Sequence, residues 1–145
     1  MSRMSTSEAV RLGLISEKEA AVIAPVKKVN KYGVSTPDRR TFNGRVYASR
    51  AEMLYAVELS LMAEVGTIVG FAEQPRVQLG PDTVYKPDFV VVGLDATFFV
   101  DIKGAEPPTF TKVKKLWAKY MRVPLHIVRH KGSTFAVSEI ITRTP

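Results

Sequence analysis

The sequence predicts an α/β domain with a central, mostly antiparallel or mixed sheet flanked by helices. Helical and strand-like hydrophobic periods alternate along its 145 residues, a length typical of one domain. Asn43 and Gly44 lie between β-type residues and give a strong hairpin signal. Two apolar runs within residues 85–104 flank a short turn and predict a second hairpin.

The N-terminal part divides into a helical segment and a basic loop. Residues 1–25 have the pattern of one or two short helices, with Ser7 as an N-cap and Pro25 as the stop. Residues 26–40 are basic and contain helix breakers, so we expect a loop or arm there. We therefore expect a helical N-terminal segment and, in residues 26–145, the body of a single globular domain.

A capped helix and two strand pieces are expected in the middle of the chain. Ser49 and Glu52 have the spacing of a capping box, and Gly66 ends the helix that follows. Residues 67–79 then predict a strand, a kink near Pro75 and a second strand piece. The helix has apolar residues at helical spacing: Leu54, Val57, Leu61 and Val65.

The C-terminal part predicts a basic amphipathic helix and another hairpin. Residues 107–123 place apolar side chains on one stripe and most of the lysines on the other faces. A strand at 124–130, a turn at 131–133 and a strand at 134–137 follow. A short helix is expected to close the chain.

Charge is the bulk property that bears most on function. The chain has 21 Lys and Arg against 14 Asp and Glu, a net charge of +7 and an isoelectric point near 9.8. A basic domain of this size favours a polyanionic partner, most often nucleic acid, although charge that serves solubility is the alternative. The absence of cysteine excludes disulfides and thiolate zinc sites and favours a reducing cytoplasm. We see no signal-peptide pattern and no membrane-spanning run, so we expect no membrane partner.

The outer end of the second predicted hairpin carries charges where a core strand is expected to be apolar. If residues 93–96 form the turn, symmetric pairing places Asp88 opposite Asp101, with Cβ atoms roughly 4.5–5.5 Å apart. Lys103 lies two residues beyond Asp101 and shares its face. The opposite face is wholly apolar and comprises Phe89, Val91, Phe98, Val100 and Ile102.

The opposed Asp88 and Asp101 carry like charges, which destabilise a sheet unless something compensates them. A hard divalent cation between the carboxylates would do so, since Mg²⁺ and Mn²⁺ prefer oxygen ligands. Lys103 beside it could hold a phosphate oxygen or polarise a water, which is the equipment of metal-assisted phosphodiester hydrolysis. The alternative is that Asp88 and Lys103 are edge charges that keep the sheet soluble, and one β-bulge would break the face relation.

Pro87-Asp88 and, after a variable gap, Asp101-Ile102-Lys103 resemble the signature of the PD-(D/E)XK nuclease superfamily. The chain is also similar to small phage-borne endonuclease-like proteins over roughly residues 30–130, in the stretches NGRVYASRAEMLYAVEL, EQP, YKPDF, VDIKG and TFTKVKKLW. The resemblance implies a restriction-endonuclease-like core. It also implies that Asp88 and Asp101 bind the metal, that the Ile102 carbonyl adds a ligand, and that Lys103 orients or activates the attacking water.

The resemblance extends to two further residues and to a cofactor. Glu52 matches the acidic residue on the preceding helix that completes the site, although it also serves the capping box. Gln74 matches a position that assists the site, or is simply polar at a strand end. The cofactor implied is Mg²⁺ or Mn²⁺. His126 and His130 have no third ligand spaced with them, so a zinc site is not expected.

Basic residues flank the candidate site on both sides and form the expected DNA footprint. For any single one of them, a solvated surface position is the simpler interpretation. The set comprises Lys27, Lys28, Lys31, Arg39, Arg40, Arg45, Arg50, Lys112, Lys114, Lys115 and Lys119.

The implied function is that of a Mg²⁺-dependent endodeoxyribonuclease that cleaves branched DNA, of the Holliday junction resolvase type. No recognition helix or zinc finger is evident, so DNA shape would provide the selectivity. Resolvases of this kind are homodimers that make paired cuts, which implies a homodimer. The location implied is cytoplasmic, in a bacterial host cell if the protein is phage-encoded. The alternatives are another branch-cleaving, flap-cleaving or recombination-linked nuclease, and a DNA-binding protein without catalysis.

Overall fold

The computed structural model describes residues 11–13 and 34–145. The chain divides into two units after Gly33, and the second unit, Val34–Pro145, forms the α/β fold. The helical segment expected at residues 1–25 lies outside the described residues, apart from 11–13. No helix in the described part is long and apolar enough to span a lipid bilayer.

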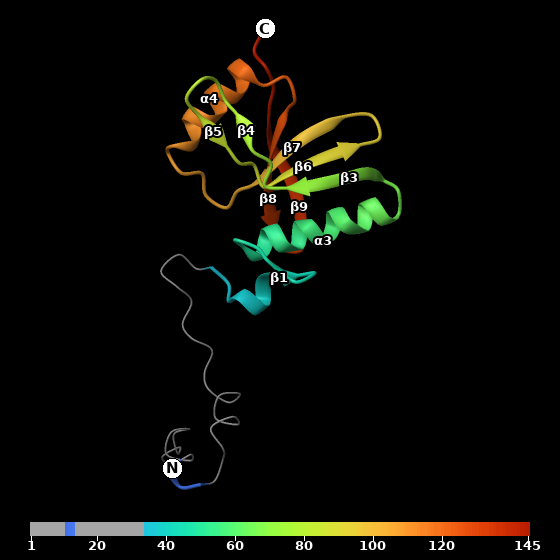
Figure 1. The fold of residues 1–145 in the computed structure, drawn as a ribbon, viewed down its shortest axis with the longest axis vertical. Helices are drawn as coiled ribbons and strands as arrows, with labels where there is room; N and C mark the ends of the chain where they lie inside the picture. The colour runs from blue at the N-terminus through green and yellow to red at the C-terminus, as the bar shows by residue number, and fades with distance from the viewer. Residues whose placement is uncertain (1–10, 14–33) are drawn as a thin grey trace. The chain divides into compact units, whose positions relative to one another are not determined.

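A five-stranded mixed sheet forms the centre of the second unit, in the order β3-β6-β7-β8-β9 (Figure 1). All neighbouring strands pair antiparallel except β7 and β8, which are parallel and joined through a helix. The predicted α/β domain with a mostly antiparallel or mixed sheet is therefore confirmed. The strands are β3 (Ile68–Glu73), β6 (Phe89–Gly93), β7 (Thr97–Ile102), β8 (Leu125–Lys131) and β9 (Thr134–Ile141).

Two α-helices flank this sheet. Helix α3 (Arg50–Glu64) begins after Ser49, whose hydroxyl accepts a hydrogen bond from the Glu52 amide at 3.1 Å, as the capping box predicts. Helix α4 (Phe110–Tyr120) is shorter than the helix expected at 107–123. It starts only after two prolines, which lack an amide donor, and it ends where Met121 becomes extended.

Two short ribbons and a 3₁₀ turn complete the unit. The 3₁₀ turn η1 (Pro37–Arg40) leads into the first ribbon, β1 (Thr41–Phe42) with β2 (Arg45–Val46). Its turn is the predicted Asn43-Gly44 pair, with φ angles of 49° and 75°. The second ribbon pairs β4 (Val77–Gln78) with β5 (Val84–Tyr85), and the sequence does not predict β5. These ribbons lie on either side of the sheet.

The chain ends in a strand, and the short helix expected there is wrong. β9 pairs with β8 from Thr134, opposite Lys131, to Ile141, opposite Leu125. A register shift between Ile127 and Val128 lets the two strands stay paired over this length. β-Branched residues near the end of β9 also favour a strand over a helix.

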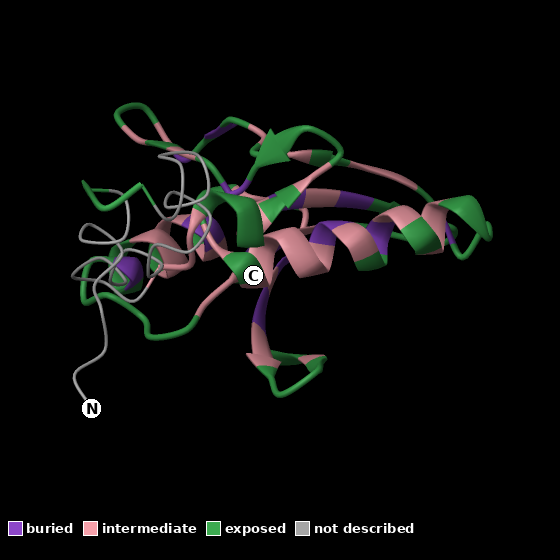
Figure 2. Ribbon diagram, turned by 90° about the horizontal axis from the view of Figure 1, so that it is seen from below, coloured by how far each residue is buried: buried purple, intermediate pink, exposed green. Residues whose placement is uncertain are grey.

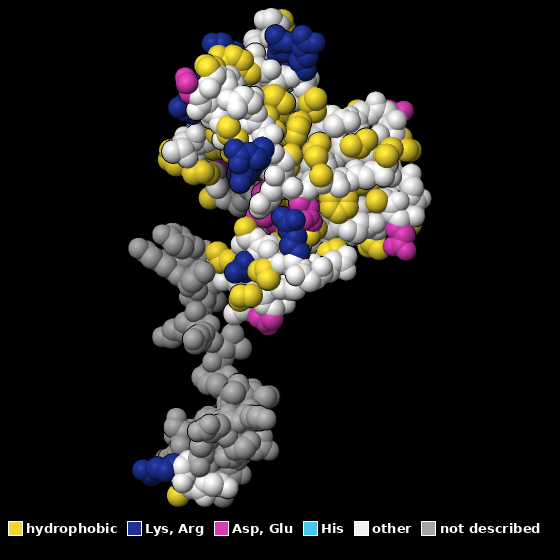
Figure 3. Space-filling view, in the orientation of Figure 1, with side chains coloured by type: hydrophobic (Ala, Val, Ile, Leu, Met, Phe, Trp, Pro, Cys, Tyr) yellow, Lys and Arg dark blue, Asp and Glu magenta, His cyan; other side chains and the backbone are white. Residues whose placement is uncertain are grey.

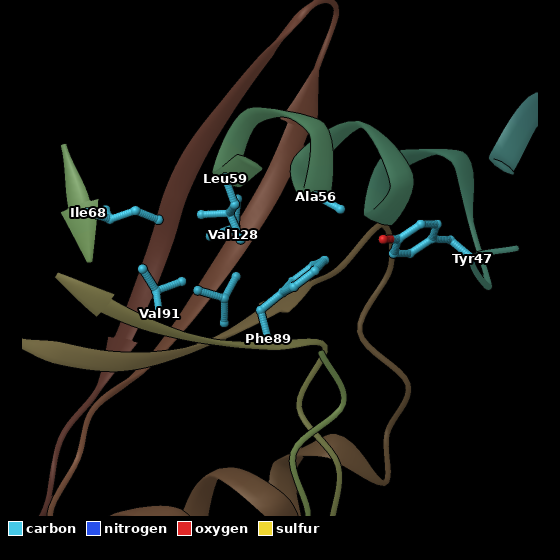
Figure 4. Close-up of a cluster of buried hydrophobic side chains, with 8 residues drawn as sticks. Tyr47, Ala56, Leu59, Ile68, Phe89, Val91 and Val128 are labelled. Atoms are coloured by element: carbon cyan, nitrogen blue, oxygen red, sulfur yellow. The ribbon is translucent and has the colours of Figure 1, made fainter. Parts of the chain in front are cut away.

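Two apolar clusters lie on opposite faces of the sheet. Ala56 and Leu59 of α3 point at the sheet and pack with Phe89 and its neighbours (Figure 4). On the other face, Trp117 of α4 packs with Leu125, and the β4–β5 ribbon joins this cluster. Burial is concentrated in the central strands and on the inward sides of the helices, while most of the loops are exposed (Figure 2). The sheet is therefore covered on both faces.

Candidate active site

The β6–β7 hairpin has the register that the sequence predicts. Phe89 pairs with Val100, and Val90 pairs with Phe99. The same register places Asp88, the residue before β6, opposite Asp101. The Asp88 amide donates to Asp101 Oδ1 at 3.2 Å, and the Ile102 amide donates to Asp88 Oδ2 at 2.7 Å. Each carboxylate therefore accepts a hydrogen bond from the main chain of the opposite segment.

The two faces of this hairpin differ as the strand alternation predicts. Phe89, Val91 and Val100 are buried in the cluster beneath α3, and Phe98 and Ile102 pack against it. The face that carries Asp101 belongs instead to the α4 side, where the Phe99 ring lies 5.2 Å from that of Trp117. The predicted apolar face is confirmed.

Asp101 has no exposed surface, and it is the one charged residue that is buried in the described part of the chain. A buried carboxylate is costly unless it is hydrogen-bonded and paired. The Tyr85 hydroxyl donates to Asp101 Oδ2, and the Lys103 Nζ lies 3.7 Å from the same oxygen. The Lys103 ammonium also donates to the Tyr85 oxygen at 3.4 Å. Asp101 is therefore held by a main-chain amide, a phenol and an ammonium group.

Negative charge accumulates around Asp88. Burial, followed by the charges of Glu52 and Asp101, raises the pKa of Asp88 to about 8, against the opposing effects of the Ile102 amide and Lys103. Burial also raises the pKa of Glu52, with a further contribution from Asp101, although the hydrogen bond from Ser49 and the charge of Lys103 oppose it. The structure thus brings Glu52, Asp88, Asp101 and Lys103 into one electrostatic cluster.

The cluster has the carboxylate ligands of a divalent-cation site, but its side chains are not arranged around a common point where a cation could bind. Within residues 11–13 and 34–145, no three His, Cys, Asp or Glu side chains stand so that they could hold a metal ion. The donor set still fits Mg²⁺ or Mn²⁺, because both ions prefer carboxylate oxygens. A cation beside Asp88 would also offset the burial and the repulsion from Glu52 and Asp101 that together raise its pKa.

The end of β3 and the first ribbon border this cluster. The main-chain N–H of Gln74 donates to the main-chain carbonyl of Asp88 at 2.9 Å, so Gln74 lies beside the site at the end of β3. Its φ angle is +47°, and the residue is exposed. The Tyr47 hydroxyl donates to Glu73, and Arg45 forms an ion pair with the same carboxylate. These bonds fix the β1–β2 ribbon next to the site.

Part of the expected DNA footprint is already engaged within the protein. The Arg40 guanidinium donates to the carbonyls of Ser35 and Tyr47, and Arg45 pairs with Glu73. In Figure 3, acidic side chains gather near the middle of the face with Lys or Arg side chains beside them. Lys114 bridges two carboxylates, at 2.9 Å from Glu106 and 2.6 Å from Glu139.

The remaining footprint residues fall into two groups. Five are exposed: Arg39, Arg50, Lys112, Lys115 and Lys119. Three lie outside the described residues: Lys27, Lys28 and Lys31.

The two histidines stack on phenylalanine rings, His126 on Phe98 with ring centroids 4.2 Å apart and His130 on Phe135 with ring centroids 4.6 Å apart.

Sequence reasoning misses two residues of the cluster, Tyr85 and Phe110. The Phe110 ring centroid lies 4.6 Å from the Lys103 Nζ, at the start of α4. Phe110 belongs to the apolar stripe of its helix, which gives no sign that its ring also meets a lysine. Tyr85 ends β5, and residues 86–88 lie between it and the start of β6, so strand alternation does not relate Tyr85 to Asp88.

No protein-family model and no curated protein matches the chain. The chemistry of the cluster itself is therefore the basis for a function.

Proposed function

We propose that the protein is a Mg²⁺-dependent endodeoxyribonuclease of the PD-(D/E)XK type that cleaves branched DNA. The observation that supports this best is the opposed Asp88–Asp101 pair with Lys103 beside it. Two carboxylates placed together at the end of neighbouring strands destabilise the metal-free protein. A role in binding a catalytic metal ion accounts for that arrangement.

Each residue of the cluster has a role in this proposal. The carboxylates of Asp88 and Asp101 and the Ile102 carbonyl would hold the metal ion, and Glu52 would complete the set. When bound, such an ion polarises the phosphate and lowers the pKa of water. Lys103, whose side chain is 21% exposed, orients the attacking water or a phosphate oxygen from the rim of the site. Cleavage would leave 5′-phosphate and 3′-hydroxyl ends.

The substrate class follows from the charge of the protein. A net charge of +7 and the exposed lysines of α4 favour a polyanion that is bound through its phosphates. Shape-selective cleavage of a four-way junction by a homodimer would give paired cuts, because a two-fold axis presents two equivalent sites. The chain would act in the cytoplasm, together with the DNA.

A second candidate is a DNA-binding protein without catalysis. The observation that favours it is that both Asp101 oxygens already accept hydrogen bonds, from the Asp88 amide and the Tyr85 hydroxyl. In this case the aspartates and Lys103 would only stabilise the hairpin.

Cleavage of a labelled four-way junction separates the two candidates. We expect paired nicks with Mg²⁺ or Mn²⁺, none with EDTA, and weaker cleavage of linear duplex, flap and splayed-arm DNA. Asp88→Asn and Asp101→Asn should lose cleavage and still bind the junction. Wild-type protein that binds every substrate but cuts none would establish the non-catalytic candidate. Equal cutting of flap and junction would instead identify another branch nuclease.

The lysines of α4 offer a matched test of DNA binding. With about six phosphates neutralised, log affinity should fall with log salt at a slope of about −5. Changing Lys112, Lys115 and Lys119 together to Ala should make that slope shallower by up to about three. Lys114→Ala should change it least, since Glu106 and Glu139 already neutralise that lysine. An unchanged slope in the triple variant would remove α4 from the DNA footprint.

A further inference from the structure

The Lys103 ammonium is enclosed on three sides. It lies 3.7 Å from Asp101 Oδ2, 3.4 Å from the Tyr85 oxygen and 4.6 Å from the Phe110 ring centroid. The two aromatic rings are themselves neighbours, with centroids 6.2 Å apart. An ammonium group over an aromatic face is attracted by the ring quadrupole. The group therefore has a defined position before any ligand arrives.

Tyr85 connects the two charged groups of this arrangement. Its hydroxyl donates to Asp101 Oδ2 and accepts from the Lys103 ammonium, so one oxygen fixes both side chains. A phenol suits this position because its hydroxyl both donates and accepts. Aspartate alone would leave the ammonium free to rotate about its flexible stem.

The β4–β5 ribbon, which carries Tyr85, packs against α4. Val77 and Leu79, in and next to β4, are buried in the same cluster as Phe110 and Trp117. The ribbon also approaches α4 so closely that a Cβ atom at Gly80 would lie 2.7 Å from the Tyr120 ring. Tyr85 is therefore presented by a packed element, as a group that orients others must be.

We infer that Tyr85 is a positioning residue of the site, and that with Phe110 it forms an aromatic enclosure that orients the Lys103 ammonium against Asp101. This inference rests on the proposed nuclease function for its catalytic part only. The enclosure itself is independent of that function. Tyr85 acts through Asp101 and Lys103, and Phe110 acts through Lys103.

Chemical labelling tests the enclosure without any reaction on DNA. Trace acetylation acts on the neutral amine, so its rate, quantified by mass spectrometry, reports how readily each lysine amino group releases its proton and meets the reagent. Tyr85→Phe keeps the ring and removes only the hydroxyl, and we expect Lys103 to be acetylated about three- to tenfold faster in this variant. Lys112, exposed on α4, should be acetylated at the wild-type rate and serves as the internal control. An unchanged rate at Lys103 overturns the enclosure.

Two further measurements complete the test. Phe110→Leu removes the ring while keeping apolar bulk, so it should also speed Lys103 acetylation, and it replaces Tyr85→Phe should that variant fail to fold. Junction cleavage by Tyr85→Phe should show kcat lowered about tenfold with an unchanged KM for DNA. Faster acetylation with unchanged kcat would overturn the positioning role. If the wild type cuts no DNA, the proposed function fails, and the acetylation rates still decide whether the enclosure exists.

Discussion

The two ends of the β6–β7 hairpin reverse the usual relation between polarity and burial. At the turn end, Val92 and Leu94 are exposed, and Val69 on the neighbouring strand is exposed beside them. At the outer end, Asp101 is completely buried and Asp88 is half-buried. Exposed apolar side chains are ordinary on protein surfaces, whereas a buried carboxylate needs partners. The unusual end is therefore the charged one.

The difference shows where the sequence departs from what folding alone would select. An apolar pair at positions 88 and 101 would pack against the same neighbours without repulsion. Instead, the structure supplies Tyr85, Lys103 and two main-chain amides to accommodate the carboxylates. Local violations of the folding rules concentrate at functional sites. Substitutions at the outer end should therefore affect stability, cleavage and pH dependence, whereas substitutions at the turn end should have small effects.

The largest expected difference between the ends is in stability. Phe89, beside Asp88, is 1% exposed, and Phe89→Ala should lower the free energy of unfolding by about 3–5 kcal/mol. Leu94→Ala at the turn should change it by less than about 0.5 kcal/mol. Urea titrations of both variants measure the two values. Similar losses would mean that the turn end is also packed.

Variants at the start of α3 distinguish the helix-capping role of Glu52 from its proposed role in cleavage. Glu52→Gln keeps a capping box, so it should fold normally, while cleavage falls by about a hundredfold or more because a metal-site carboxylate is lost. Ser49→Ala is the matched variant for the cap: it should lose about 1 kcal/mol of stability, and its cleavage rate should fall far less than that of Glu52→Gln, because the Glu52 carboxylate stays and loses only its 3.4 Å hydrogen bond from Ser49. Full activity in Glu52→Gln would leave Glu52 as a cap only.

The outer end also predicts how stability depends on pH in the absence of metal. The folded pKa of Asp88, about 8, lies above its ordinary value, so the folded state holds a proton that the unfolded state has released. Stability should therefore fall as pH rises from about 6.5 to about 8.5. Burial lowers the pKa of His126, which makes stability rise with pH, but this effect acts below that range.

Two asparagine variants isolate this effect in thermal unfolding. Asp88→Asn should remove most of the fall in Tm between these pH values, because the titrating group is gone. Asp95→Asn, in the exposed turn, should keep the wild-type fall. A wild-type fall in Asp88→Asn would assign the pH dependence to other groups.

The smallest effect is expected on the exposed face of the turn end. Val92→Thr keeps a β-branched residue at a position that is already 40% exposed. Stability should change by less than about 0.5 kcal/mol, and junction cleavage should not change. A large loss of either would show that the turn end takes part in a contact of functional importance.

The sequence predicts much of the fold and the charged residues of the cluster, but not the two aromatic ones. The hairpin register, the cap at Ser49 and the apolar face of β7 depend on neighbours along the chain, and each is confirmed. The enclosure of Lys103 depends on Tyr85 and Phe110, which reach it only through tertiary packing. No periodicity of their own segments could indicate that meeting.

The terminal strand shows the same limit in the fold. The last residues can form a helix or a strand on local grounds, and the choice is made by β8, which offers an unpaired edge. The metal, the DNA and the homodimer stay predictions, since they depend on molecules other than this chain.

The hydrogen bond from the Ile102 amide to Asp88 makes one backbone signal a reporter of the site. The amides of a regular ladder donate to main-chain carbonyls of neighbouring strands, but this one donates to a titratable carboxylate at 2.7 Å. Its NMR resonance should therefore move when Asp88 changes its protonation state or engages a cation, while the resonances of its neighbours move less. Titration with Mg²⁺ in the absence of DNA would then follow events at a single oxygen. The occupancy of the site could be read in solution from a protein that performs no reaction.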